Sequence, residues 1–166
     1  LYTVPKADQG SWVSLALDPK GRLLTSDQYG GLFRLTLPPL GSSAGTKIEK
    51  LAVKLGEVAP APGAPPAAGG VGKKGKGDQA PPDIGAHGLL YAFDSLYVMV
   101  SEVANKRGVW RLRDTNGDDQ FDEVKFLRET KGGGEHGPHA LVLSPDGKSI
   151  YFANGNHTDL PVGLEK

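Results

Sequence analysis

One segment pattern occurs three times along the chain and limits the folds open to it. Each copy has an apolar strand, a tight turn and a second apolar strand that ends in a polar residue. The copies are residues 10–27, 85–102 and 137–154, and each is entered through Gly-x-Trp or Gly-x-His. No segment has a convincing helical period. The repeats therefore predict an all-β chain.

Two of the copies continue into further strands. Residues 31–37 and 108–113 would form third strands, and residues 48–53 and 124–127 would form fourth strands. Four antiparallel strands repeating at about 50 residues are typical of β-propeller blades. The repeats account for about two and a half four-stranded antiparallel blades. Closed propellers have about four to eight blades, so we expect this chain to be a β-propeller fragment.

The spacing of the repeats also predicts an insertion. The distance from His87 to His139 fits one blade, whereas that from Trp12 to His87 is longer by about half a blade. Residues 57–83 are rich in Pro, Gly, Ala and Lys and have almost no large apolar side chains, so we expect no regular structure there. The expected divisions are a blade over 1–56, this insertion, a blade over 84–131, and the start of a truncated next blade over 132–166.

The amino-acid composition excludes several kinds of partner and site. The 19 basic and 19 acidic residues cancel, which argues against nucleic acid as a partner. There is no cysteine, so this segment has no disulfide, no thiolate metal site and no covalent haem attachment. No apolar run approaches the roughly 20 residues that span a bilayer, and the chain starts at Leu1 without a leader-like segment. We expect no membrane span in this chain.

An acidic loop follows the third strand of the second repeat. Oxygen-bearing side chains stand at positions 1, 3, 5 and 9 of residues 114–122, with a backbone carbonyl at position 7. The predicted calcium ligands are Asp114, Asn116, Asp118, the Gln120 carbonyl and Asp122. An EF-hand needs Gly at loop position 6 and Glu at position 12, where this loop has Asp119 and Lys125. The flanking segments are also strand-like rather than helical. The alternative is a solvated Asp/Asn turn without metal.

Histidines gather at the entrances of the predicted innermost strands. In a propeller these entrances surround one mouth of the central channel. His87 precedes one such strand, and Glu135, His136 and His139 precede another. A neutral imidazole beside a carboxylate can accept a proton or bind a transition metal. Asp27 and Asn154 end the second strands and should lie at the same mouth. The alternative is that each histidine only bonds a neighbouring backbone carbonyl.

Four motifs together resemble a known family. Residues 88–98, 112–122, 134–147 and 155–158 are similar to the propeller of the large planctomycete-type haem-binding proteins, often labelled membrane-bound dehydrogenases. More distantly they resemble the soluble quinoprotein sugar dehydrogenases. In those enzymes a catalytic His stands five residues before the Leu that opens a strand, and His136 matches that place. An Arg that contacts the cofactor precedes that Leu, and here the position is Ala140.

The resemblance implies a role in electron transfer. His136 would be the catalytic base beside Glu135, with His139, His87, Asn154 and Asp27 around a pyrroloquinoline quinone. It also implies a periplasmic location, further blades of the same polypeptide, and haem c in a separate cytochrome domain. We therefore expect this chain to be the propeller segment of an oxidoreductase that acts on a sugar or polyol. The alternative is a non-catalytic propeller that binds a carbohydrate or protein partner.

Overall fold

The computed structural model describes residues 2–42, 44–55, 84–101 and 106–159. These residues form ten strands and one short helix, α1 (Lys6–Gln9), which the sequence pattern did not predict. The predicted insertion at 57–83 lies outside the described residues. Within the described part of the chain, no helix is long and apolar enough to cross a membrane.

The strands form three antiparallel sheets, each built from consecutive strands. The first sheet contains β1 (Trp12–Leu17), β2 (Leu23–Asp27), β3 (Leu32–Thr36) and β4 (Lys47–Lys50). The second contains β5 (Ala86–Ala92), β6 (Ser95–Val100), β7 (Gly108–Arg113) and β8 (Glu123–Glu129). The third is the hairpin of β9 (Pro138–Leu143) and β10 (Ile150–Asn154).

These sheets confirm the all-β prediction and the order of the strands. The largest difference in bounds is at β4, which ends at Lys50 instead of continuing to Val53. The Leu51 amide still donates to the Leu32 carbonyl, and Leu51 and Val53 are buried. The segment after β4 therefore packs into the core although it leaves the strand ladder.

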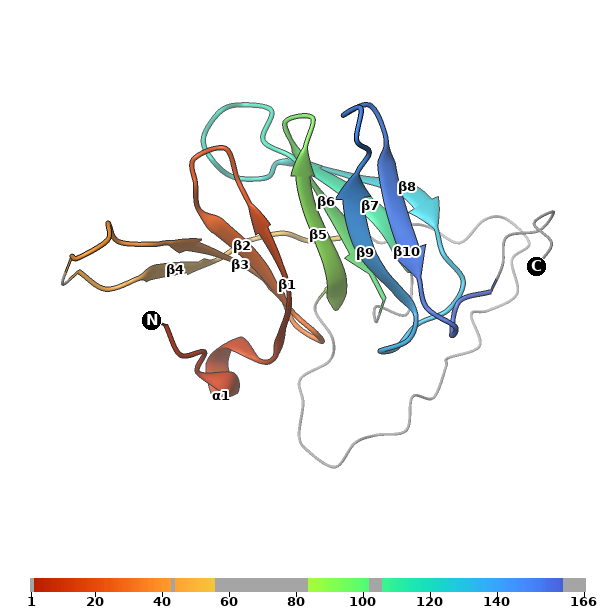
Figure 1. The fold of residues 1–166 in the computed structure, drawn as a ribbon, viewed down its shortest axis with the longest axis horizontal. Coiled ribbons are helices and arrows are strands. Elements are labelled where there is room, and N and C mark those ends of the chain that lie inside the picture. Colours follow the sequence, from red (N-terminus) through yellow and green to blue (C-terminus); the bar gives the residue numbers. More distant parts are fainter. Residues whose placement is uncertain (1, 43, 56–83, 102–105, 160–166) are drawn as a thin grey trace.

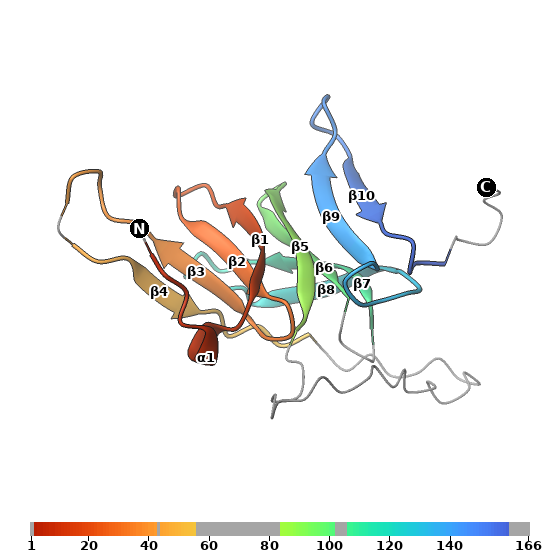
Figure 2. The same ribbon diagram turned by 60° about the horizontal axis from the view of Figure 1, so that its bottom comes forward.

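The first strands of the three sheets lie next to one another in the order β1, β5, β9 (Figures 1 and 2). One apolar core fills the space between the first and second sheets, and includes Leu24, Leu89 and Trp110. A second core joins the second and third sheets through Met99, Val109 and Leu141. Since successive side chains of a strand point to opposite faces, β5, β6 and β7 each contribute to both cores, whereas β8 contributes to the first.

The molecule has two distinct ends. β1, β5 and β9 all begin at one end, which we call the strand-entry end (Figure 1). The tight turns that follow these strands, and the loop between β7 and β8, lie at the opposite end, which we call the turn end (Figure 1). The histidine-bearing segments and the acidic loop are therefore at opposite ends of the sheets.

Candidate functional site

A β-bulge recurs in each of the three sheets near the strand-entry end. The register shifts between Trp12 and Ser14 in β1, between Ala86 and Gly88 in β5, and opposite Pro138 to Leu141 in β9. These stretches hold Val13, His87 and His139, respectively. Bulges redirect side chains and are common next to functional sites. The repeated bulge is the local feature that positions His87 and His139.

The register also corrects how the repeats align. Leu15 pairs with Thr25, and Leu89 pairs with Val98, at matching places in the first two sheets. Val13 is then the counterpart of His87, whereas the sequence repeat had aligned Trp12 with it. Both strands carry the same one-residue bulge, so the offset arises before it, where the sequence repeat aligns Gly10 with Gly85.

Strands β5 and β9, and the loops that follow β2 and precede β9, bring residues together around His87 at the strand-entry end. The rings of His87 and His139 are stacked, with centroids 5.7 Å apart. Gln28, which directly follows β2, contributes its backbone to a hydrogen bond with His87. The Gln28 side chain donates from Nε2 to Oε1 of Glu135 at 3.3 Å. We call Gln28, His87, Glu135 and His139 the entry cluster.

The environment of His87 favours a neutral imidazole. Only 8% of the residue is exposed, and this burial is the main cause that lowers its pKa below the usual 6.5. The neighbouring His139 lowers the pKa further, while the Gln28 backbone and the Glu135 carboxylate act in the opposite direction. A neutral imidazole has one ring nitrogen that can accept a proton. The entry cluster can therefore accept protons and hydrogen bonds near neutral pH.

Close backbone packing fixes the junction on which the entry cluster depends. A Cβ at residue 88 would overlap the carbonyl oxygen of His139, so only glycine fits there. The buried hydroxyl of Ser101 donates to the carbonyl of Pro138. These two contacts hold the start of β9 against β5 and β6, which keeps His139 beside His87.

The other predicted histidine does not join this cluster. The ring of His136 packs edge-on against His157, with centroids 5.0 Å apart, and the His157 amide donates to the His136 carbonyl. Both residues are exposed. Of the four mouth residues predicted, the structure thus gathers His87, Glu135 and His139, while His136 pairs elsewhere.

Asp27 and Asn154 occupy matching ends of the second strands, as predicted. Asn154 pairs with Pro138 across the third sheet, and Asp27 pairs with Trp12 across the first. The Asp27 carboxylate accepts a hydrogen bond from the Ser11 amide at 2.9 Å and packs against Gly10 and Gly30. Asp27 therefore holds the entrance of β1, and its neighbour Gln28 reaches the entry cluster.

The acidic loop closes on itself through hydrogen bonds. Asp114 accepts from the amides of Gly117 and Asp119, at 2.7 and 2.8 Å. Asp122 accepts from the amide and hydroxyl of Thr115, at 2.7 and 2.6 Å, which lowers the pKa of its carboxyl.

The predicted calcium ligands inside the loop are also engaged. Asn116 accepts from the Asp118 amide, and Asp118 accepts from the Gln120 amide, each at 2.9 Å. Across the described residues, no group of three or more His, Cys, Asp or Glu side chains is arranged to hold a metal ion. Calcium binding by this loop stays a prediction.

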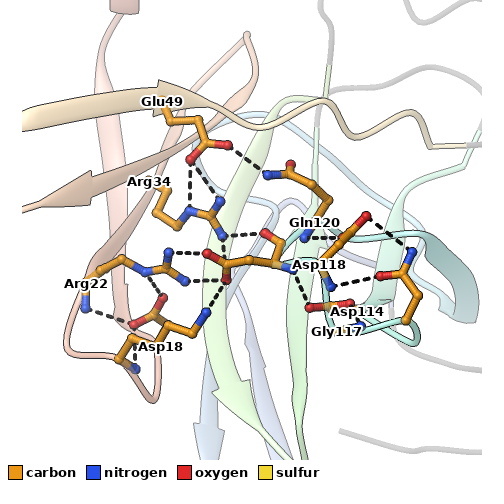
Figure 3. A network of polar contacts seen from close by, with 11 residues as sticks. Asp18, Arg22, Arg34, Glu49, Asp114, Gly117, Asp118 and Gln120 are labelled. Carbon is orange, nitrogen blue, oxygen red and sulfur yellow. Dashed lines mark hydrogen bonds and ion pairs between the residues drawn. The ribbon is translucent and has the colours of Figure 1, made fainter.

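The same loop makes a contact that sequence reasoning missed. Asp119 accepts two hydrogen bonds from the Arg22 guanidinium, at 2.5 and 2.7 Å, and these hold the pKa of Asp119 well below its usual value. The backbone carbonyl of Asp119 accepts from Arg34 at 2.8 Å, and Arg34 also binds Glu49 (Figure 3). This network clamps the loop of the second sheet onto the first sheet at the turn end.

The resemblance places an Arg in contact with the quinone, and this chain has Ala at that position. Ala140, at the place of the family's Arg, is exposed on β9 and offers only a methyl group. The residues at this position therefore do not fit that cofactor. Comparison with protein-family models, with curated proteins and with solved structures gave no match.

Proposed function

We propose that the three sheets are consecutive blades of a β-propeller. The order of strands within each sheet, the adjacent first strands and the recurring bulge all support this arrangement. In a propeller, the beginnings of the innermost strands surround a channel mouth where ligands bind. The strand-entry end would be that mouth.

We further propose that this mouth binds a small hydroxylated molecule, of the sugar or polyol class. The observation that carries the proposal is the meeting of His87 in β5 and His139 in β9 with Gln28, which follows β2, and Glu135, which precedes β9. Carboxylate, amide and imidazole groups together supply both donors and acceptors for hydroxyl groups. A site shared by several sheets is also typical of ligand pockets, in which a few polar groups converge.

Dehydrogenase activity is the second candidate. The specific observation in its favour is the lowered pKa of His87, which leaves a neutral proton acceptor beside the Glu135 carboxylate. The base would then be His87, whereas the family resemblance assigns that role to His136. Because Ala140 does not fit the quinone, we derive no oxidation step, and a ligand-binding mouth is the better supported function.

Calorimetric titration of the protein with a panel of sugars and polyols tests the binding proposal. The variant Glu135→Gln removes one charged acceptor and should weaken binding by about tenfold, since hydrogen bonds to charged groups contribute roughly 1.5–3 kcal/mol. Glu129→Gln, at an exposed position on β8, is the matched control and should bind normally. Failure of every ligand in the panel, or equal binding by both variants, would rule the proposal out.

An assay with an artificial electron acceptor separates the two candidates. If the protein oxidises a bound sugar, His87→Gln should reduce turnover by about 10²-fold, because a positioned base contributes at least that much. The matched variant His136→Gln would show the larger loss if the assignment from the resemblance is right. Binding without turnover would leave the non-catalytic propeller as the function.

A further inference from the structure

Two short segments pair with each other next to the entry cluster. Residues 131–137 lead into β9 and residues 155–159 follow β10, so both segments lie at the strand-entry end (Figure 1). The backbone hydrogen bonds between them are 2.8–2.9 Å long and include one from the His157 amide to the His136 carbonyl. The backbone therefore holds these two histidines side by side, away from the sheet faces.

Two glycines fix the backbone positions of His136 and His157. A Cβ at residue 132 would overlap the His157 carbonyl oxygen, and a Cβ at residue 155 would overlap the His136 carbonyl oxygen. Gly132 also has a φ of 127°, which residues with a side chain rarely adopt. Each histidine backbone thus packs on a glycine of the opposite segment, and the two imidazoles project from fixed neighbouring positions.

The spacing and inclination of these two rings suit a shared metal ion. Their centroids are 5.0 Å apart, and their planes meet at 75°. Imidazole nitrogens bind Zn²⁺ at about 2.0–2.1 Å, so two rings on one tetrahedral ion have centroids roughly 5 Å apart. The lone pair of a ring nitrogen lies in the ring plane, and two steeply inclined planes let both lone pairs reach one point. The rings of His87 and His139, inclined by only 23°, do not have this arrangement.

We propose that His136 and His157 together bind a divalent transition-metal ion of the Zn²⁺ class. Imidazole is a favoured ligand of Zn²⁺, Ni²⁺ and Cu²⁺, and both side chains are exposed to an incoming ion. Because the described residues contain no group of three or more His, Cys, Asp or Glu side chains arranged to hold a metal ion, water would fill its other positions. The ion would link the segment before β9 to the segment after β10 and offer exchangeable positions at the strand-entry end. The proposal does not depend on the ligand of the entry cluster.

Titration of the full chain with Zn²⁺, followed by calorimetry and by NMR of the histidine rings, tests this site. The wild-type protein should bind one Zn²⁺ saturably, with shifts in the ring signals of His136 and His157 and none in those of His87 and His139. The variants His136→Gln and His157→Gln should each weaken Zn²⁺ binding by at least about tenfold, since even outer-shell partners of a bound metal contribute that much.

His139→Gln is the matched control, because it also removes one imidazole near the start of β9 but leaves the proposed pair intact. This variant should bind Zn²⁺ like the wild type, and circular dichroism should show that all three variants keep their strands. Absence of saturable Zn²⁺ binding by the wild type overturns the proposal. Ring shifts spread over all four histidines, or wild-type affinity in His136→Gln and His157→Gln, overturn it as well.

Discussion

Replacing Asp119 with Asn should weaken the contact between the first and second sheets. Asp119 joins Arg22, Arg34 and Lys20 of the first sheet to the loop between β7 and β8. Asn preserves the size of the side chain and tolerates the positive φ of 71° at this residue, which most side chains do not. The substitution therefore removes the charge with little change in backbone strain.

The expected loss follows from the burial of each partner. The Arg22 side chain is 16% exposed and makes two hydrogen bonds to Asp119, so this pair should dominate. Lys20 is 62% exposed, and its ion pair should contribute little because exposed pairs are screened by water. Arg34 keeps its bonds to Glu49 and to the backbone carbonyl of residue 119. We expect a loss of about 2 kcal/mol, as charged hydrogen bonds contribute roughly 1.5–3 kcal/mol and Asp119 is partly exposed.

Urea unfolding at neutral pH measures this loss, and Asp118→Asn in the same loop is the matched control. Asp118 is exposed and makes only hydrogen bonds within the loop, so its replacement should cost less than about 0.5 kcal/mol. The lowered pKa of Asp119 means that its contribution is present above about pH 4 and is lost as the pH falls. Equal stability of the Asp119→Asn variant and the wild type at pH 7 would refute the clamp.

Three further outcomes are expected. Gly88→Ala should destabilise the protein by about 1–3 kcal/mol in urea unfolding through overlap with the His139 carbonyl, whereas Gly45→Ala, with open space around it, should have little effect. Because the pKa of His87 is lowered, the free energy of unfolding should fall as the pH drops below about 6.5. The variant His87→Gln should show a weaker dependence of this free energy on pH between about pH 7.5 and about pH 5. Parallel pH dependences in the variant and the wild type would contradict this expectation. If the 114–122 loop binds calcium, chelator should lower the melting temperature, and an unchanged value would exclude calcium.

The strands were predictable because their pattern is local. Alternating apolar residues and Asp/Gly turns appear within short windows, so the three repeats and the third and fourth strands could be placed from sequence. The bulge could not be placed, because it depends on which residue of the partner strand each position faces. The sequence pattern also aligns Trp12 with His87, because it matches Gly10 with Gly85, whereas the register assigns that position to Val13.

The candidate site was predictable only in part. His87, Glu135 and His139 were found because histidines at strand entrances are distinctive, but Gln28 was missed because it follows Asp27 in an ordinary polar turn. Its partner Glu135 is 107 residues away in the sequence. Asp119 was likewise considered only as a loop residue, since its partner Arg22 is 97 residues away and no local pattern marks the pair.

The titration of His87 tests the convergence of the three sheets most directly. Glu135 raises the pKa of His87 and His139 lowers it, so NMR titration should give a lower pKa in Glu135→Gln and a higher one in His139→Phe, relative to the wild type. Opposite shifts of His87 in these two variants are the result that the entry cluster predicts. An unchanged His87 titration in both variants would show that these residues do not meet.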